Sequence, residues 1–233
     1  MLTKRLKRER ATPPPATFRP RTGRAPAKIN LTLAVLGKRP DGYHELRSMV
    51  IGVGLYDAVT LAPRAAGAPA VRCDVPELAR EDNLAWRAVE RLAGREGVDP
   101  SALSLRLDKR IPVGSGMGGG SSDAAAVLRL LNAVGRMGYD RRELAGIGAA
   151  LGSDVPVFFH LPAARMSGRG ERVEPVSMRW SGWVMLVHTG IEVSTRAVYA
   201  AWDEHPVTTP RQVAEEREAF IGSAASAEAW MPK

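Results

Sequence analysis

The sequence predicts an α+β fold, in which strands and helices follow one another without regular alternation. Three observations support this prediction. Residues 27–36 alternate between apolar and polar side chains, as a half-buried strand does. Residues 84–93 repeat apolar side chains at helical spacing. A glycine-rich run at 114–120 then separates another alternating stretch from two further helical patterns, an order that favours α+β over repeating βαβ units.

The first elements form a set of strands. After the strand at 27–36, residues 39–42 (Arg-Pro-Asp-Gly) have strong turn chemistry, because proline presets φ and glycine accepts positive φ. Residues 43–53 then read as a returning strand. Residues 59–62 read as a third strand, which ends at Pro63.

One helix and one strand precede the glycine-rich run. Residues 64–80 are expected to be irregular. Residues 81–83 (Glu-Asp-Asn) cap a helix that Gly94 or Gly97 ends. The leucines that alternate with polar residues at 103–107 then predict a strand.

Two helices and a late strand complete the predicted elements. Ser121 or Ser122 is expected to start the first helix. Asp140 opens the second helix, with Glu143 three residues later in the position of a capping box. Residues 183–188 are largely apolar and read as a buried strand that opens a new section of the chain.

The basic charge is concentrated at the N-terminus. The whole chain has a net charge of +8, of which residues 1–24 carry +7, so the remainder is nearly neutral. Because this segment is proline-containing and shows no amphipathic period, we expect a disordered basic tail. We divide the chain into this tail (1–24), a first domain (25–178) and a partial second domain (179–233). The neutral body disfavours nucleic acid as a partner, although the basic arm keeps RNA binding open as an alternative.

Composition narrows the class of protein. No apolar run approaches the roughly 18 residues that span a bilayer, and the N-terminus lacks the apolar core of a secretory signal. The single cysteine, Cys73, excludes an intramolecular disulfide and fits a reducing compartment. We interpret it as a small buried hydrophobe. We therefore expect a cytoplasmic protein without a membrane partner.

Residues 114–120 (Gly-Ser-Gly-Met-Gly-Gly-Gly) predict a phosphate-binding site, and we call them the glycine segment. Glycine costs conformational entropy, so an ordinary connection would not use five in seven residues. Such a backbone can approach an anion closely, and the helix after it adds unpaired N–H groups. Ser121 and Ser122 offer hydroxyls to phosphate or magnesium, and Asp123 lies within reach of a metal. A flexible linker with a serine N-cap is the alternative.

The glycine segment also satisfies a second pattern. Gly114, Gly116 and Gly119 match the G-x-G-x-x-G dinucleotide fingerprint. Pro112 just before the segment weighs against that assignment, as does the lack of an acidic residue ending a second strand about 20 residues later. The Walker pattern G-x-x-x-x-G-K-[ST] is also absent, so the segment is not the phosphate-binding loop of a P-loop enzyme. A dinucleotide-binding oxidoreductase is therefore kept as a hypothesis, but it ranks below an ATP-binding kinase and below an RNA-binding protein.

A few other polar residues fit the needs of a kinase that acts on an alcohol. Such an enzyme needs a carboxylate near the hydroxyl and a cation for the negative charge. Asp154 is the best candidate for this carboxylate, since apolar neighbours are expected to hold it away from bulk water. The local sequence is equally consistent with an aspartate that only caps a helix or stabilises a turn. Lys28 and Asn30 share the polar face of the first strand, where a solvated edge lysine is the simpler interpretation. His44 and the neighbouring Tyr43 could bind a planar base by stacking. The alternative interpretation is that they are partly buried aromatic residues of a hairpin.

Taken together, these segments resemble the GHMP kinases, the family of galactokinase, homoserine kinase and mevalonate kinase. The matching motifs run in unbroken order over roughly residues 25–200 and form a more specific set than any single pattern. They are Ala25–Leu31, Arg39–Leu46, Glu81–Leu84, Ile111–Ala126 and Leu151–Pro156.

The resemblance implies roles for individual residues. Lys28 and Asp154 would be the catalytic pair, and Asn30 would help to place the reacting hydroxyl. Tyr43, His44 and Tyr199 would hold the cytosine end of a cytidine diphosphate substrate. The ATP-binding residues would be Asn83 and Lys109 on the adenine side, and Pro112, Gly114, Gly116, Met117, Gly118, Gly119, Gly120, Ser121 and Ser122 at the phosphates.

The implied activity is that of a small-molecule kinase. With ATP, and Mg²⁺ at its phosphates, it would phosphorylate the 2-hydroxyl of 4-diphosphocytidyl-2-C-methyl-D-erythritol in non-mevalonate isoprenoid synthesis. The implied fold pairs an N-terminal domain, shared with part of a small-subunit ribosomal protein, with a ferredoxin-like C-terminal domain. A late Gly-Ser-Gly-Pro-like loop of the family has no match after residue 200, so we expect an incomplete C-terminal domain and keep an inactive truncated homologue as an alternative. We expect a monomer or homodimer.

Overall fold

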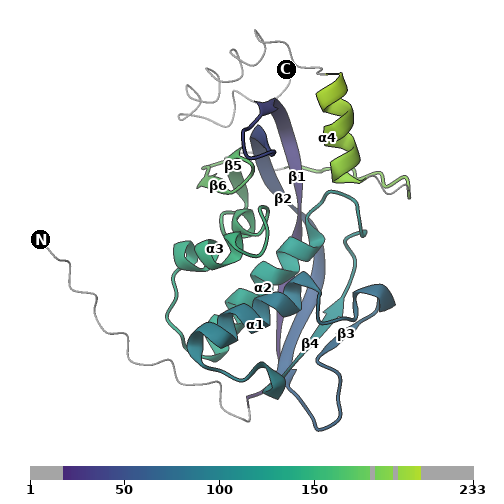
Figure 1. The fold of residues 1–233 in the computed structure, drawn as a ribbon. Helices are drawn as coiled ribbons and strands as arrows, with labels where there is room; N and C mark the ends of the chain where they lie inside the picture. Colours follow the sequence, from purple (N-terminus) through teal and green to yellow (C-terminus); the bar gives the residue numbers. More distant parts are fainter. Residues whose placement is uncertain (1–17, 179–181, 191–193, 206–233) are drawn as a thin grey trace, which may run out of the picture.

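The computed structural model describes residues 18–178, 182–190 and 194–205. Its helices and strands follow in the mixed order that the sequence predicts, and the α+β class is confirmed (Figure 1). In chain order they are β1 (Arg21–Lys38), β2 (His44–Pro63), β3 (Val71–Cys73), α1 (Leu84–Glu96), β4 (Leu103–Asp108), α2 (Gly119–Val134), α3 (Arg141–Ala149), β5 (Ala163–Gly168), β6 (Arg172–Pro175) and α4 (Thr195–Glu204), with short 3-10 helices at Pro76–Leu78, Pro100–Ala102 and Pro156–Phe159.

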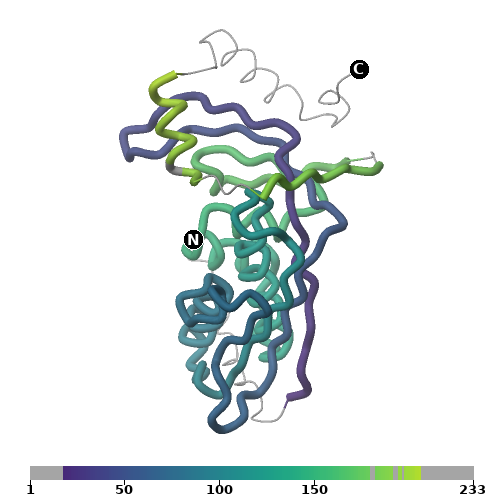
Figure 2. Tube along the Cα trace, turned by 90° about the vertical axis from the view of Figure 1, so that its right-hand side faces the viewer, coloured from purple at the N-terminus to yellow at the C-terminus, as the bar shows by residue number. Residues whose placement is uncertain are grey.

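Two long antiparallel strands, β1 and β2, organise the sheet. Strand β2 pairs with β4 along one part of its length and with β5 along another, in the order β3-β4-β2-β5-β6, with β1 paired to β2. Three register shifts interrupt the β1–β2 ladder, and such bulges bend a strand pair. Figure 2 shows the consequence: the pair runs beside the helices and then bends over toward the side on which they lie, where it carries the hairpin against which α4 lies.

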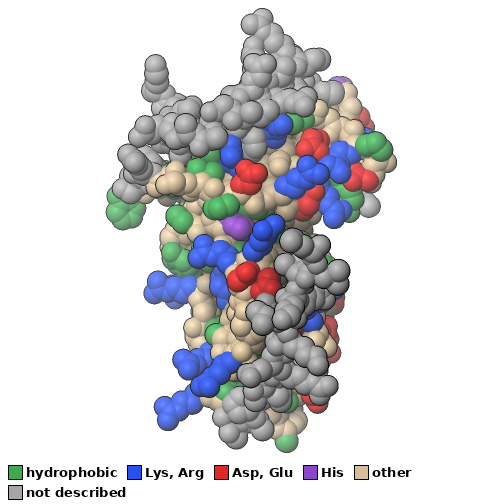
Figure 3. Space-filling view, turned by 90° about the vertical axis from the view of Figure 1, so that its left-hand side faces the viewer, with side chains coloured by type: hydrophobic (Ala, Val, Ile, Leu, Met, Phe, Trp, Pro, Cys, Tyr) green, Lys and Arg blue, Asp and Glu red, His purple; other side chains and the backbone are tan. Residues whose placement is uncertain are grey.

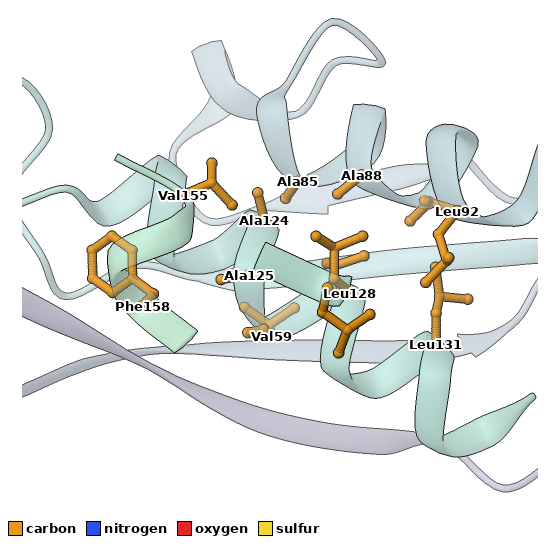
Figure 4. Packing of buried hydrophobic residues seen from close by; sticks show 14 of the residues in the cluster. Val59, Ala85, Ala88, Leu92, Ala124, Ala125, Leu128, Leu131, Val155 and Phe158 are labelled. Carbon is orange, nitrogen blue, oxygen red and sulfur yellow. The ribbon is translucent and has the colours of Figure 1, made fainter. Parts of the chain in front are cut away.

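The core lies between the sheet and the helices. Small residues on both α1 and α2, such as Ala88 and Ala124, let the two helices lie close together (Figure 4). Leu92, Leu128 and Leu131 belong to the same core and are fully buried. Each such leucine contributes about 1.5–3 kcal/mol by leaving water. This packing holds α2, and with it the glycine segment, at a fixed place on the sheet.

The start of the chain corrects one predicted boundary. Residues 21–24, predicted as the end of the disordered tail, belong to β1, where Arg21 lies opposite Leu61 and Arg24 opposite Ala58. The basic side chains of Arg21 and Arg24 are exposed, so their charge does not oppose backbone pairing. Residues 1–17 of the predicted tail lie outside the described residues.

The second and third predicted strands are a single strand, β2, which ends at Pro63 as predicted. The sequence prediction left residues 54–58 outside both strands, and this stretch contains glycine and aspartate, which are depleted in strands. In the fold a register shift falls at this point, since Pro26 lies opposite Tyr56 but Ala27 lies opposite Val53. The two extra residues of β2 are absorbed as a bulge, and the strand continues.

Other local predictions meet mixed outcomes. The stretch 64–80 is less irregular than expected, because β3 pairs there with β4 in parallel. Cys73, at the end of β3, is partly exposed and not buried as predicted. Asn83 caps α1, Gly97 ends it in the left-handed conformation, and Asp140 with Glu143 forms the predicted capping box. Helix α2 begins at Gly119, earlier than predicted.

The predicted strand at 183–188 is wrong. Residues 182–189 form no helix or strand, and the side chains of Trp183 and Met185 are exposed. A strand needs a neighbour for its backbone groups, and among the described residues none pairs with this segment. The division at residue 179 stays a prediction, because residues 206–233 lie outside the described part of the chain. In the described residues, no helix has the length and apolar character that crossing a membrane requires.

Candidate active site

The glycine segment borders an open cavity of about 850 Å³, which we call the glycine cavity. It is lined by the chain that leads into α2, by the first turn of α1 and by Asp154. Most of the predicted ATP-binding residues line it: Asn83, Lys109, Pro112, Gly114, Gly116, Gly118, Gly119, Gly120 and Ser121. Met117 and Ser122 lie outside the lining.

Three of the five glycines of the segment are required by its backbone. Gly114, Gly116 and Gly118 all have φ near +70°, a conformation that costs other residues free energy. At Gly118 a Cβ would also lie 2.8 Å from the Phe158 ring. Gly119 and Gly120 form the first turn of α2, so the positive end of the helix dipole faces the cavity. This arrangement fits an anion and argues against a flexible linker.

The two predicted catalytic residues lie next to each other: Asp154 lines the glycine cavity, and Lys28 lies behind it, outside the lining. The Lys28 ammonium is 3.6 Å from a carboxylate oxygen of Asp154 and donates to Oδ1 of Asn30 at 2.6 Å. The backbone N–H of Lys28 donates to the Met117 carbonyl at 3.0 Å, which ties β1 to the glycine segment. Lys28 is only 6% exposed, so the interpretation as a solvated edge lysine is wrong. Asn30 in turn donates to Ser48 at 2.6 Å.

The predicted apolar surroundings of Asp154 are wrong. Its side chain is 39% exposed, so apolar neighbours do not shield it from water. The apolar residues after it, Pro156–Phe159, form a 3-10 helix that is buried in the core. Asp154 precedes that helix and lines the cavity instead. A carboxylate in this position is open to a substrate that enters the cavity.

A buried ionic cluster underlies the glycine segment, and sequence reasoning missed one of its members. The Lys109 ammonium donates to Asp57 and, at 2.6 Å, to Asp123. All three side chains are at most 5% exposed. An aspartate in the middle of a strand is unfavourable and was the available signal for Asp57.

The cluster has more acidic than basic groups, because two carboxylates share one ammonium. Burial raises the pKa of the Asp123 carboxyl to about 6, although Lys109 acts in the opposite direction. Burial lowers the pKa of Lys109, but the two carboxylates outweigh it and the net shift is upward. Asp123 therefore gains less from the shared ammonium than it loses by leaving water.

The adenine-side roles of Asn83 and Lys109 stay predictions. Asn83 lines the glycine cavity, but its side chain accepts from the Ala85 N–H and donates to the Leu78 carbonyl. The Lys109 ammonium is held by the two carboxylates of the buried cluster. Only the remaining surfaces of these two residues are left to contact a base.

A second cavity, of about 480 Å³, lies between the β1–β2 hairpin and α4, and we call it the hairpin cavity. It brings together the predicted cytosine-binding residues Tyr43, His44 and Tyr199. The His44 and Tyr199 rings stack with centroids 4.6 Å apart, whereas Tyr43 is half exposed under the guanidinium of Arg169. The N-terminal end of α4 lines the glycine cavity, so this helix borders both.

Asp203 of α4 fastens the helix to the hairpin. Its carboxylate accepts from the Lys38 ammonium at 2.5 Å and lies 2.6 Å from Nε2 of His44. These two contacts, Lys38 first, lower the pKa of Asp203. Sequence reasoning did not single out Asp203, which is 159 positions from His44.

Comparison with known proteins identifies the family of the chain. Residues 83–160 match the family described as GHMP kinases N terminal domain. A 4-diphosphocytidyl-2-C-methyl-D-erythritol kinase of Symbiobacterium thermophilum is 42% identical over 196 residues, which cover 84% of this chain and 69% of that protein. The chain belongs to the GHMP kinase family. A kinase of the same description from Halorhodospira halophila is 43% identical over 192 residues, with 80% of this chain and 66% of that protein covered.

Solved structures confirm the predicted GHMP kinase fold. A crystal structure of 4-(cytidine 5'-diphospho)-2C-methyl-D-erythritol kinase matches with a TM-score of 0.57 and 37% identity, over 68% of this chain and 56% of that chain. Mevalonate pyrophosphate decarboxylase from Streptococcus pyogenes matches with a TM-score of 0.60 at 12% identity, over 88% of this chain and 68% of that chain, a likeness of fold alone. The chain spans about two thirds of the length of the curated relatives it matches.

Proposed function

We propose that the chain binds ATP in the glycine cavity and transfers its γ-phosphoryl group to the 2-hydroxyl of 4-diphosphocytidyl-2-C-methyl-D-erythritol. This reaction would serve isoprenoid precursor synthesis by the non-mevalonate route. The observation that carries the proposal is the meeting of Lys28 and Asp154, 3.6 Å apart, beside a cavity lined by the glycine segment. Relatives 42–43% identical, over four fifths of this chain, are named as kinases for this substrate.

The proposed chemistry assigns each residue of the pair a task. The substrate hydroxyl oxygen attacks the γ-phosphorus, and the bond from that phosphorus to the bridging oxygen breaks as ADP leaves. Asp154 accepts the hydroxyl proton, for which its exposure to the cavity suits it. The Lys28 ammonium, held by Asn30, stabilises the negative charge that develops on the oxygens. The N–H groups at the start of α2 bind the phosphates.

The oxygen donors at the cavity fit a Mg²⁺ ion bound mainly through the phosphates. Mg²⁺ takes one or two protein oxygens beside phosphate and water, and both Ser121 and Asp154 line the cavity with hard oxygens. In the described residues no group of three or more His, Cys, Asp or Glu forms a metal cage. When bound, the ion supplies neutralisation of charge on the phosphate oxygens.

The acceptor's cytosine would bind in the hairpin cavity. Because the His44 and Tyr199 rings already stack on each other, a base enters beside this pair and not between its members. The half-exposed Tyr43 offers a second aromatic face. Helix α4 borders both cavities, which suits a substrate that reaches from one to the other.

The alternatives make different predictions. An RNA-binding protein using its basic arm would bind with steep salt dependence, lost on removal of residues 1–24. Outside residues 1–24 the net charge is nearly zero, which does not favour a nucleic-acid surface on the body. The face drawn in Figure 3 has interspersed basic and acidic side chains in its upper part and basic side chains alone along its lower left edge. An inactive homologue would bind ATP without turnover. A cytoplasmic location and a monomeric or homodimeric state remain part of the proposal.

A coupled assay of ADP release with the cytidine diphosphate substrate tests the proposal. We expect the Asp154→Asn variant to lose turnover by about 10²–10⁴-fold, since general base catalysis contributes that much. ATP affinity, measured separately, should stay within about twofold. Equal turnover in both proteins would remove Asp154 from its role, and ATP binding without turnover in the wild type would indicate the inactive homologue.

A further inference from the structure

The buried cluster of Asp57, Lys109 and Asp123 has no part in the proposed chemistry, yet it is built into the floor of the glycine cavity. Asp57 is 1% exposed and Asp123 2%, and each is paired with the one ammonium of Lys109. Burying these groups costs free energy that pairing only partly returns. A cluster of this kind calls for an explanation beyond stability.

Asp57 binds three consecutive residues of the chain that leads from β4 into the glycine segment. Its Oδ1 accepts the backbone N–H groups of Arg110 at 2.5 Å and Ile111 at 2.8 Å. Its Oδ2 accepts the Lys109 ammonium. Hydrogen bonds to an ionised acceptor are about twice as strong as neutral ones. One carboxylate on β2 thus fixes the course of residues 109–111.

The same ammonium continues the connection to α2. Lys109 donates to Asp123, in the first turn of that helix, at 2.6 Å. A Cβ added at Gly119 would lie 3.3 Å from the Lys109 nitrogen and 3.4 Å from Oδ2 of Asp57. The cluster therefore lies directly against the backbone where α2 begins. Both ends of the glycine segment are attached to it, one through residues 109–111 and the other through Asp123.

We propose that Asp57 is a positioning residue for ATP: its carboxylate holds one end of the glycine segment directly and the other through Lys109 and Asp123, so that the N–H groups at the start of α2 meet the phosphates beside Lys28 and Asp154. The inference rests on the proposed function. It gives Lys109 a structural task in addition to the adenine-side contact expected from the sequence. It also explains why Asp57 occupies a strand position where a β-branched residue would be more stable.

The experiment measures ATP binding by calorimetry, in the presence of Mg²⁺, for the full chain and two variants. Asp57→Asn is nearly isosteric and leaves one cation and one anion in the cluster, so we expect it to fold. We expect its Kd for ATP to rise about tenfold or more, since small displacements of binding groups are costly. The Kd of the cytidine diphosphate acceptor should stay within about twofold, because the hairpin cavity is built elsewhere.

Asp74→Asn is the matched control. The Asp74 carboxylate also accepts from Lys109, through its backbone N–H at 2.9 Å, but it is exposed and lies outside the cavity lining. Its ATP affinity should stay within about twofold of the wild type. A merely structural Asp57 would lower the melting temperature and leave both dissociation constants of the folded protein unchanged, and that result would overturn the inference.

Hydrogen exchange keeps the inference testable if Asp57→Asn does not fold. In the ATP-free wild type, we expect the amides of Arg110 and Ile111 to be protected by at least about tenfold relative to an unstructured peptide. Exchange at the unstructured rate would overturn it. Failure of the wild type to bind ATP would overturn the proposed function itself, whereas unchanged binding in Asp57→Asn overturns only the role of Asp57.

Discussion

The glycine cavity and the hairpin cavity are built in different ways. The first is bordered by a backbone with three glycines at positive φ and by a buried ionic cluster that joins β2, the end of β4 and α2. The second depends on side chains of one helix, α4, against one hairpin, through Asp203 and the ring of Tyr199. Local backbone geometry and burial thus fix the first site, whereas the second depends on a few partly exposed contacts.

The first cavity should therefore tolerate substitution poorly. Gly118→Ala forces a Cβ to within 2.8 Å of Phe158 and retains φ near +70°. We expect a loss of about 2–5 kcal/mol in the free energy of unfolding, from backbone strain and overpacking together. Denaturant unfolding measures it.

Gly42→Ala is the control from the hairpin cavity. Gly42 has φ of +82° and nothing within 4 Å of an added Cβ, so only the backbone strain applies. We expect about 1–2 kcal/mol there. Equal losses at the two positions would show that the Phe158 contact relaxes at little cost, and the contrast between the cavities would weaken.

A smaller effect should appear in the pH dependence of stability. The pKa of Asp123 is raised to about 6 from its model-peptide value of 3.8, so between pH 4 and 6 the folded state holds a proton that the unfolded state releases. This group therefore makes the protein less stable as pH rises through that window, by at most about 3 kcal/mol. The wild type, but not Asp123→Asn, should show this loss.

The measurement compares urea unfolding of the two proteins at pH 4, 5, 6 and 7. The difference in free energy of unfolding should shift in favour of Asp123→Asn as pH rises and level off above about pH 7. Taking the difference removes most of the contribution of carboxylates elsewhere in the chain. A constant difference across the series would contradict the assignment of the pKa shift to Asp123.

The smallest effect is expected in the hairpin cavity. Asp203→Asn weakens the contacts with Lys38 and His44, which lie at a partly exposed surface. We expect the KM for the acceptor to rise about two- to fivefold, with the melting temperature nearly unchanged. Glu204→Gln, on the same helix and exposed, is the control. An unchanged KM in Asp203→Asn would mean that α4 holds its place without this carboxylate.

Much of the fold and site could be predicted where the signal is local. Asn83 and Asp140 cap the helices that the sequence assigns to them, and Lys28 meets Asp154 as the motifs imply. The predictions that failed needed information from distant residues. The bulge in β2 depends on β1, and the strand expected at 183–188 has no neighbour among the described residues.

By itself, the sequence determined the helix caps, the glycines at positive φ in the glycine segment and the turn at 39–42, where the Gly42 N–H donates to the Arg39 carbonyl at 3.0 Å. These features depend on residues a few positions apart. Only the tertiary structure decided that Asp57 lies beneath the glycine segment and that Asp203 joins α4 to the hairpin. Asp57 and Lys109 are 52 positions apart, and Lys38 and Asp203 are 165 apart. Burial and charge pairing depend on which distant residues the fold brings together, so they cannot be predicted from the residues next to Asp57 or Asp203 in the sequence.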